Sequence, residues 1–311
     1  MSSDRDPASQ TPDRREALRL LTSLVGGSAA AGAMGAGQAR AAEPARNTQV
    51  EGLFSLKGKV AVLTDSGGIG SREVAQLLAG AGAHVVMADR DFESAKGTAA
   101  LISKAGGSAV GMQADIENEA SVIALFADVA KAAGRLDILV NCAGMLANQP
   151  LVETTLQVWD DVQSLNLRAN FLCMREGVRQ MLAAGHGGRI VNITTIGSRH
   201  PVMNGNEAYG AARQGVSALT RNTALDYAKD GILANTVLVG SVLNKVTNHP
   251  TTAAAMKAGR IFSGPISEGN RRPLGNGEMI DVAAAVLYLV APSGRWITGH
   301  ELVVDGGFLI S

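Results

Sequence analysis

The segment from Lys59 to Asp89 constrains the fold of this chain more than any other stretch. An apolar run at residues 59–63 predicts a buried strand, and a glycine-rich turn follows it. Residues 72–81 have helical spacing, and a second apolar run at 84–88 ends in Asp89, nineteen residues after Gly70. This order is the dinucleotide-binding fingerprint, in which the helix N-terminus receives a pyrophosphate and the acid binds ribose hydroxyls.

The same strand and helix rhythm continues to the end of the chain. Further apolar runs predict strands at residues 109–113, 138–140, 188–193 and 232–237, with a closing strand within 298–308. Helical patterns cover 156–183 and 281–289, and no second linker or repeat interrupts 55–311. The chain is therefore predicted to form a single α/β domain, a Rossmann-type doubly wound parallel seven-stranded sheet with helices on both faces.

Composition restricts the class of protein and of partner. The chain is 46% hydrophobic and 18% charged, with 28 basic and 28 acidic side chains, which is typical of a globular protein. A net charge of zero gives no electrostatic reason to expect nucleic acid or an anionic membrane as a partner. Cys142 and Cys173 are expected to be buried thiols, and no Cys/His spacing predicts a metal site.

Residues 1–41 differ from the rest and resemble a bacterial twin-arginine export signal. The pair Arg14-Arg15 precedes a mild apolar stretch, and Ala39-Arg40-Ala41 has a small-x-small cleavage pattern. The stretch is poor in Leu and Ile, so we expect no stable membrane span. Residues 42–54 are predicted to be a linker and 55–311 the mature domain. The resemblance implies the export machinery as a partner and a periplasmic or secreted protein. The alternative is an N-terminal tail that carries no export signal, which leaves the protein cytoplasmic.

Tyr209 and Arg213 are the first candidates for chemistry. Four residues apart on a helix, they lie on the same face, one turn apart. The ordinary pKa of a phenol is about 10, so it transfers protons poorly at neutral pH unless a nearby charge favours the phenolate. The pair thus predicts an acid–base tyrosine beside a cation. The alternative is a packing tyrosine with an arginine on the helix surface.

Tyr209 and its surroundings resemble the Tyr-x-x-x-Lys signature of the short-chain dehydrogenase/reductase family. The resemblance implies alcohol/carbonyl oxidoreduction with Tyr209 as acid–base, Thr195 in the place of the catalytic serine, and Asn166 holding a proton-relay water. Arg213 stands where the family has lysine. A guanidinium keeps the charge but is planar, bulkier and unable to release a proton, so we expect weakened but feasible acid–base chemistry.

The resemblance also implies the residues that hold the cofactor. They are Thr64, Ser66, Gly67, Gly68, Ile69, Gly70, Asp89, Arg90, Asp115, Ile116, Asn141, Ala143, Gly144, Tyr209, Arg213, Gly240, Val242 and Asn244. Two alignments of the glycine turn stay open. Aligning Thr64 without gaps replaces the three family glycines by Asp65, Ile69 and Ser71, whereas aligning residues 68–70 to the motif's end leaves the loop one residue short. In the family Asn141 mainly steadies the sheet.

Asp89 bears on the choice of cofactor. A carboxylate at this position accepts hydrogen bonds from a free 2′-hydroxyl and repels a 2′-phosphate, which favours NAD over NADP. Arg90, the next residue, partly offsets that repulsion.

The sequence thus predicts an exported NAD(P)-dependent oxidoreductase. Its expected substrate is a small-molecule alcohol or ketone whose class (sugar, steroid, acyl compound or small alcohol) the sequence leaves open. Residues 245–272 fit a substrate lid, and the family ending at 298–308 implies a homodimer or homotetramer. A rival hypothesis is a catalytically weakened family member that binds a ligand or partner, because the glycine turn, Thr195 and Arg213 all depart from the family pattern.

Overall fold

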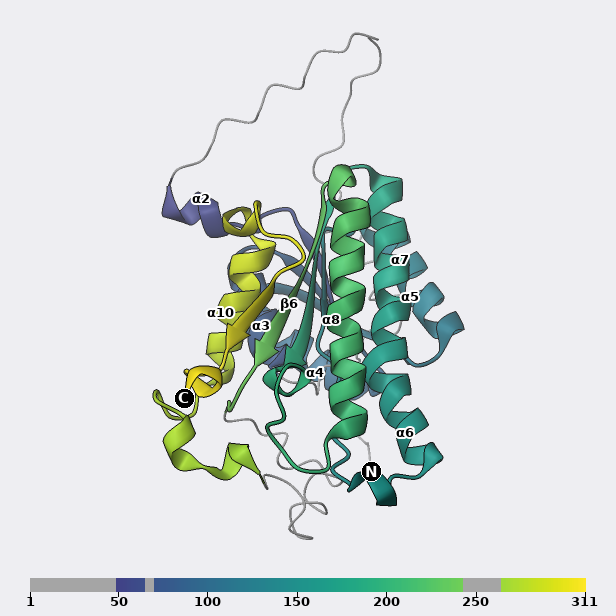
Figure 1. The fold of residues 1–311 in the computed structure, drawn as a ribbon. Coiled ribbons are helices and arrows are strands. Elements are labelled where there is room, and N and C mark those ends of the chain that lie inside the picture. The colour runs from purple at the N-terminus through teal and green to yellow at the C-terminus, as the bar shows by residue number, and fades with distance from the viewer. Residues whose placement is uncertain (1–48, 65–69, 243–263) are drawn as a thin grey trace, which may run out of the picture.

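Seven parallel strands form one sheet in the computed structural model, which describes residues 49–64, 70–242 and 264–311 (Figure 1). The strand order is β3-β2-β1-β4-β5-β6-β7. The strands are β1 Val60–Thr64, β2 His84–Asp89, β3 Ser108–Gln113, β4 Ile138–Asn141, β5 Gly188–Thr195, β6 Ile232–Val239 and β7 Glu301–Val304. The predicted seven-stranded, doubly wound fold is confirmed.

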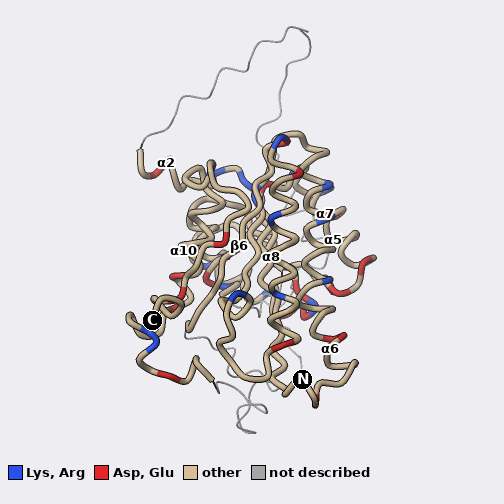
Figure 2. The backbone as a smooth tube through the Cα atoms, in the orientation of Figure 1, with Lys and Arg blue, Asp and Glu red and all other residues tan. Residues whose placement is uncertain are grey.

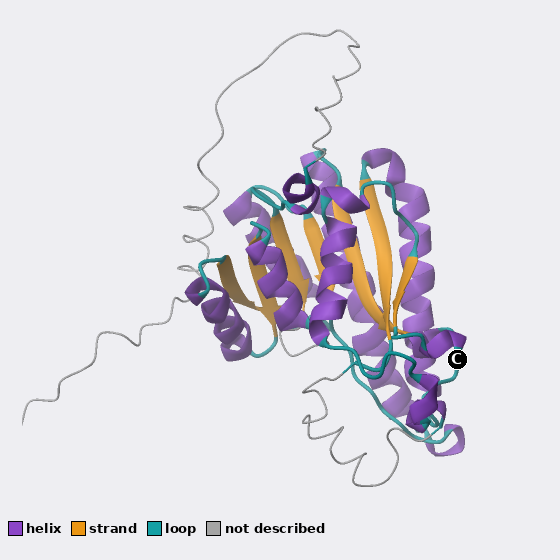
Figure 3. Cartoon of the chain, turned by 90° about the vertical axis from the view of Figure 1, so that its left-hand side faces the viewer, coloured by secondary structure: helices purple, strands orange, loops and turns teal. Residues whose placement is uncertain are grey.

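Helices cover both faces of the sheet (Figures 1 and 3). One layer contains α3 Ser71–Gly80, α4 Phe92–Lys104 and α10 Met279–Val290. The other contains α5 Glu119–Ala133, α7 Ala169–Ala184 and α8 Glu207–Tyr227. The remaining helices are α2 Val50–Phe54 and α6 Leu156–Gln163. Short 3-10 helices are η2 Leu151–Glu153, η4 Ile196–Ser198, η5 Ala228–Asp230, η7 Pro265–Ser267, η8 Gly269–Arg271, η9 Pro292–Gly294 and η10 Phe308–Ile310.

The central strands are mostly apolar because helices exclude water from both faces. Every residue of β1 is buried, and its side chains alternate between the two core layers, Val62 on one side and Leu63 on the other. Cys142 and Cys173 are buried as predicted, and burial raises the pKa of the Cys173 thiol to about 12. These thiols fill space in the core.

The structure changes three details of the predicted elements. The helical pattern of 156–183 is divided, because α6 and α7 flank the π-helical segment η3 Ser164–Arg168. Helix α2 forms inside the predicted linker 42–54. Helix α3 begins at Ser71, directly after Gly70, whose φ of 68° lies in the left-handed region that favours glycine.

A chain of polar side chains ties the middle of the sheet to α8. The Thr64 hydroxyl donates to Asn141 Oδ1 at 3.3 Å, and Asn141 Nδ2 donates to Asn192 Oδ1 at 2.8 Å. Asn192 Nδ2 in turn donates to Thr220 Oγ1 at 2.8 Å. Asn141 therefore steadies the sheet, as expected.

Strand order reverses between β1 and β4, and ligands of open α/β sheets bind outside the carboxyl ends of the strands at such a point.

Charged residues of both signs are interspersed along the described backbone (Figure 2). Within the described ranges, no helix has the length and apolarity to cross a bilayer. Nor do the side chains of that part of the chain form a cluster of three or more His, Cys, Asp or Glu suited to a metal.

Candidate active site

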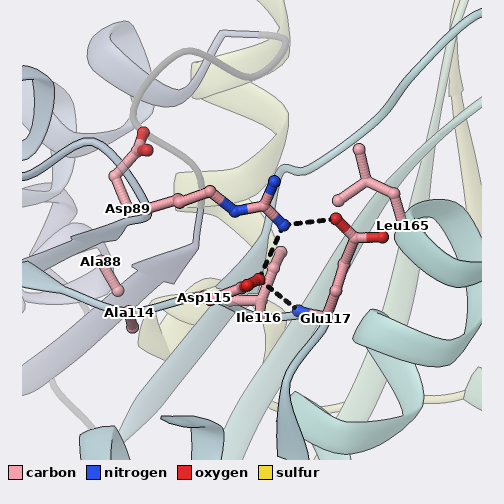
Figure 4. Close-up of a pocket in the computed structure, with 8 residues that line it drawn as sticks. Ala88, Asp89, Ala114, Asp115, Ile116, Glu117 and Leu165 are labelled. Atoms are coloured by element: carbon pink, nitrogen blue, oxygen red, sulfur yellow. Dashed lines mark hydrogen bonds and ion pairs between the residues drawn. The ribbon is translucent and has the colours of Figure 1, made fainter.

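A cavity of about 160 Å³ lies at the carboxyl ends of β2 and β3 (Figure 4). Its apolar lining is Ala88, Ala114, Ile116 and Leu165. Asp89, Arg90, Asp115 and Glu117 supply the polar lining. Small apolar walls with a polar rim fit a flat heterocycle joined to a hydroxylated sugar. Asp89, Arg90, Asp115 and Ile116, four of the predicted cofactor residues, therefore come together here.

Arg90 is held by two carboxylates at the edge of this cavity. Its Nη2 lies 2.8 Å from Asp115 Oδ1 and 2.6 Å from Glu117 Oε2 (Figure 4). Hydrogen bonds with Asp115 and then Glu117 raise the pKa of Arg90 above its usual value. Asp115 is further fixed because its Oδ1 accepts from the Glu117 backbone at 3.0 Å. The charge of Arg90 is thus already balanced by carboxylates of the protein.

Asp89 lines the same cavity. It ends β2, and its Oδ1 accepts from the backbone N–H of Asp91 at 2.8 Å. This turn fixes the direction of the carboxylate. Figure 4 shows the Asp89 carboxylate apart from those of Asp115 and Glu117. Four predicted residues of the glycine turn, Ser66, Gly67, Gly68 and Ile69, lie outside the described residues, as do Asn244 and part of the predicted lid.

Tyr209 and Arg213 lie side by side inside the protein. Tyr209 is 2% exposed and Arg213 is 1% exposed, so the interpretation of Arg213 as a surface residue is wrong. The Arg213 guanidinium carbon lies 5.1 Å from the centroid of the Tyr209 ring. The ring packs with Val162, Ala208 and Ala212. The cation therefore faces the ring of the tyrosine, a stabilising cation–π arrangement.

Main-chain carbonyls at the ends of two central strands hold the guanidinium. Arg213 Nη2 donates to the Ala143 carbonyl and Nη1 to the Ile193 carbonyl at 3.5 Å. Among the residues that the structure describes, Nε has no hydrogen-bond partner. A Cβ atom at Gly144 would overlap Nη2 far inside van der Waals contact. The absence of a side chain at Gly144 is what admits an arginine here.

Asn166 lies next to this pair, within the π-helical segment. Its side chain is wholly engaged, because Oδ1 accepts from Met145 N at 3.1 Å and Nδ2 donates to Met145 O at 3.0 Å and Val162 O at 2.9 Å. Its carbonyl accepts from Asn170 Nδ2 at 3.0 Å. These bonds anchor the segment after β4 to the helix layer. The predicted role of Asn166 in holding a water stays a prediction.

Thr195 is the last residue of β5 and is half-buried. Its Oγ1 accepts from the backbone N–H of Gly197 at 3.1 Å. The hydroxyl oxygen is thereby held in place, and its proton remains available to donate to an oxygen of a bound molecule.

A second cavity, of about 670 Å³, begins at Gly197, two residues after Thr195. Its lining comes from residues 197–207, together with Pro150, Leu151 and Gly210. Asn206 belongs to this lining and is not among the residues that the sequence predicts. Its position three residues before Tyr209, directly before α8, is the signal that could have found it.

Two predicted cofactor residues at the end of β6 lie in closely packed turns. A Cβ at Gly240 would come within 2.6 Å of the Asp305 backbone, so the two chains approach closely there. Val242 is half-buried and forms a parallel bridge with Gly277. These turns lie at the same carboxyl edge of the sheet as Thr195, which is where a ligand spanning the crevice would end.

Comparisons with known proteins agree with this geometry. A family model described as enoyl-(acyl carrier protein) reductase matches residues 64–309. D-threitol dehydrogenase of Mycolicibacterium smegmatis is 31% identical over 86% of this chain and 98% of its own length. A short-chain dehydrogenase/reductase of Aspergillus oryzae is 32% identical over 83% of this chain and 97% of its own.

A solved structure extends the likeness to three dimensions. A protein of Beutenbergia cavernae assigned as an NAD(P)-dependent gluconate 5-dehydrogenase, with NADP bound at low occupancy, has a TM-score of 0.75 and 32% identity. The match covers 84% of this chain and 100% of that one.

Proposed function

Because the chain belongs to the short-chain dehydrogenase/reductase family, we propose that it is an NAD(P)-dependent oxidoreductase that interconverts an alcohol and a carbonyl, with Tyr209 as acid–base. The single observation that carries the proposal is the packing of the buried Arg213 against Tyr209 at the carboxyl ends of the strands, where Thr195 ends β5 and a cavity of about 670 Å³ begins at Gly197. D-threitol dehydrogenase and the gluconate dehydrogenase, by name, act on alcohols.

The described residues fit a dinucleotide. The cavity of about 160 Å³ suits a purine, and the bare backbone at Gly144 lies in the crevice between β1 and β4. Asp89 would bind the adenosine ribose, and Arg213 would lie under the nicotinamide end. A bound nicotinamide supplies the hydride acceptor or donor.

Protein side chains manage the proton and the reacting oxygen. In the direction of oxidation, Thr195 donates a hydrogen bond to the alcohol oxygen while Tyr209 takes the hydroxyl proton. In reduction, Tyr209 returns the proton to the carbonyl oxygen. Arg213 keeps a fixed positive charge against the ring of Tyr209, 5.1 Å from its centroid, and holds the Ala143 carbonyl in place.

We expect the enzyme to prefer NAD, and Asp89→Asn to weaken this preference. Asp89 presents a carboxylate to the ribose, while Arg90 is committed to Asp115 and Glu117 and does not offset its charge. Removing the carboxylate removes the repulsion of a 2′-phosphate, so the NADPH to NADH affinity ratio should rise about 10- to 100-fold. Fluorescence titrations with both cofactors measure this ratio.

Asp91→Asn is the matched control for this substitution. Asp91 caps α4 by accepting from Glu93 N at 3.0 Å, and it does not line the cavity. The cofactor ratio should stay within about twofold of wild type in this variant. An unchanged ratio in Asp89→Asn would contradict the assignment of Asp89 to the ribose.

We further propose that the protein is exported by the twin-arginine route with its cofactor already bound, and that it acts as a homodimer or homotetramer. The Arg14-Arg15 pair and the Ala-x-Ala pattern support export, although residues 1–48 lie outside the described structure. This route moves folded proteins, so a bound dinucleotide can travel with the domain. Mass spectrometry of protein purified from the periplasm should detect NAD. Consistently empty periplasmic protein would contradict the proposal.

A further inference from the structure

Asn206 has a buried side-chain amide that has no evident role in stabilising the fold. It is 8% exposed, and its Oδ1 has no hydrogen-bond partner within the described part of the chain. An asparagine directly before a helix usually caps it, but the side chain of Asn206 makes no capping bond to α8. Buried polar groups are normally hydrogen-bonded, and one that is not requires an explanation.

The backbone around Asn206 is held in place by a neighbouring loop. Asn148 Nδ2 donates to the Asn204 carbonyl at 3.1 Å, and Gln149 N donates to the Gly205 carbonyl at 2.9 Å. The Asn206 carbonyl accepts from Gly210 N at 2.7 Å in the first turn of α8. The amide is thus presented from a fixed backbone, as a binding group must be.

Asn206 faces the same small space as the Thr195 hydroxyl. A Cβ atom at Gly197 would lie 3.4 Å from Thr195 Oγ1 and 3.5 Å from Asn206 Nδ2. Both Gly197 and Asn206 line the cavity of about 670 Å³. A molecule whose reacting oxygen lies at Thr195 therefore places its neighbouring substituent within reach of the Asn206 amide.

We propose that Asn206 is a specificity-determining residue that binds a second oxygen of the substrate, on the carbon next to the reacting one. This inference rests on the proposed function and adds a substrate class, namely vicinal diols and the matching α-hydroxy ketones. A side-chain amide can present either its N–H or its oxygen to the cavity by rotating about χ2, so it matches a hydroxyl, which both donates and accepts. A simple alcohol leaves the amide unpaired.

The test compares butane-2,3-diol with butan-2-ol, which share a secondary carbinol and differ in the second hydroxyl. We expect the wild-type protein to oxidise the diol with a kcat/KM about tenfold or more above that of the alcohol. Asn206→Leu should abolish this preference mainly through KM for the diol, with butan-2-ol little changed. Asn222→Leu is the matched control, because Asn222 is exposed on α8 and does not line the cavity, and it should keep the preference.

A second readout does not require turnover. Calorimetric titration of butane-2,3-diol into the complex with NADH, where the diol cannot be oxidised, should show weaker binding in Asn206→Leu and unchanged binding in Asn222→Leu. Equal oxidation of both alcohols by the wild type, or equal loss in the two variants, overturns the inference and leaves the oxidoreductase proposal standing. Absence of NADH binding together with absence of NAD reduction by either alcohol overturns both.

Discussion

Replacing Tyr209 with phenylalanine should lower kcat for alcohol oxidation by about 100- to 10,000-fold, the range that general acid–base catalysis contributes. The substitution removes only the hydroxyl. The ring remains to pack with Val162, Ala208 and Ala212 and to lie 5.1 Å from the guanidinium carbon of Arg213. Stability and the dissociation constant for NADH should therefore change little. Steady-state kinetics, NADH fluorescence and thermal unfolding measure the three quantities.

Tyr227→Phe is the matched control for Tyr209→Phe. Tyr227 is the last residue of α8, eighteen positions further along the same helix, and packs at the edge of the core layer that contains α5 and α7, outside the cluster around Tyr209. Its hydroxyl is not part of the candidate site, so kcat should be unchanged. A Tyr209→Phe variant that keeps wild-type turnover would remove Tyr209 from the mechanism and favour the rival hypothesis of a ligand- or partner-binding protein.

Gly144→Ala should destabilise the fold by about 1–3 kcal/mol and weaken NADH binding, because the new methyl group overlaps Arg213 Nη2. The guanidinium must then leave the Ala143 carbonyl, which loses its donor inside the protein. Urea unfolding and NADH titration measure the two effects. Gly97→Ala, on the open side of α4 where nothing lies within 4 Å of the new Cβ, should instead be neutral or stabilising.

The same clash predicts a coupling between Gly144 and Arg213. In an Arg213→Lys background the planar group over Gly144 is gone, so Gly144→Ala should cost less, with a coupling free energy of about 1 kcal/mol or more. Arg213→Lys alone should raise kcat, because it restores a compact cation that can reach a bound ribose. Strictly additive free energies would show that the guanidinium does not occupy the space over Gly144. An Arg213→Lys protein with no gain in kcat would show that this residue does not limit turnover.

The strands and the helix layers were predictable because each leaves a local pattern. Continuous apolar runs such as 59–63 mark strands buried on both faces, and the acid at Asp89 marks the end of the second strand. The π-helical segment around Asn166 was not predictable, since its residues carry the same spacing as the helices on either side. Its geometry depends on hydrogen bonds to Met145, twenty-one residues away.

The sequence was enough to predict which residues belong to the candidate site, but not how these residues contact one another. Helical spacing placed Arg213 beside Tyr209, yet its burial depends on the carbonyl of Ala143, seventy residues earlier. No local pattern reports such a contact. Asn206 was missed for a related reason, because an asparagine before a helix is ordinarily explained by capping, and only the structure shows that this one does not cap.

The central claim is that this site still binds a nicotinamide dinucleotide although Arg213 replaces lysine. The most direct test is a fluorescence titration of residues 42–311, the linker and the mature domain, with NADH. We predict saturable binding at one site per chain, tighter than for NADPH and weakened by Gly144→Ala. Absence of binding to both NADH and NADPH by folded protein would contradict the account.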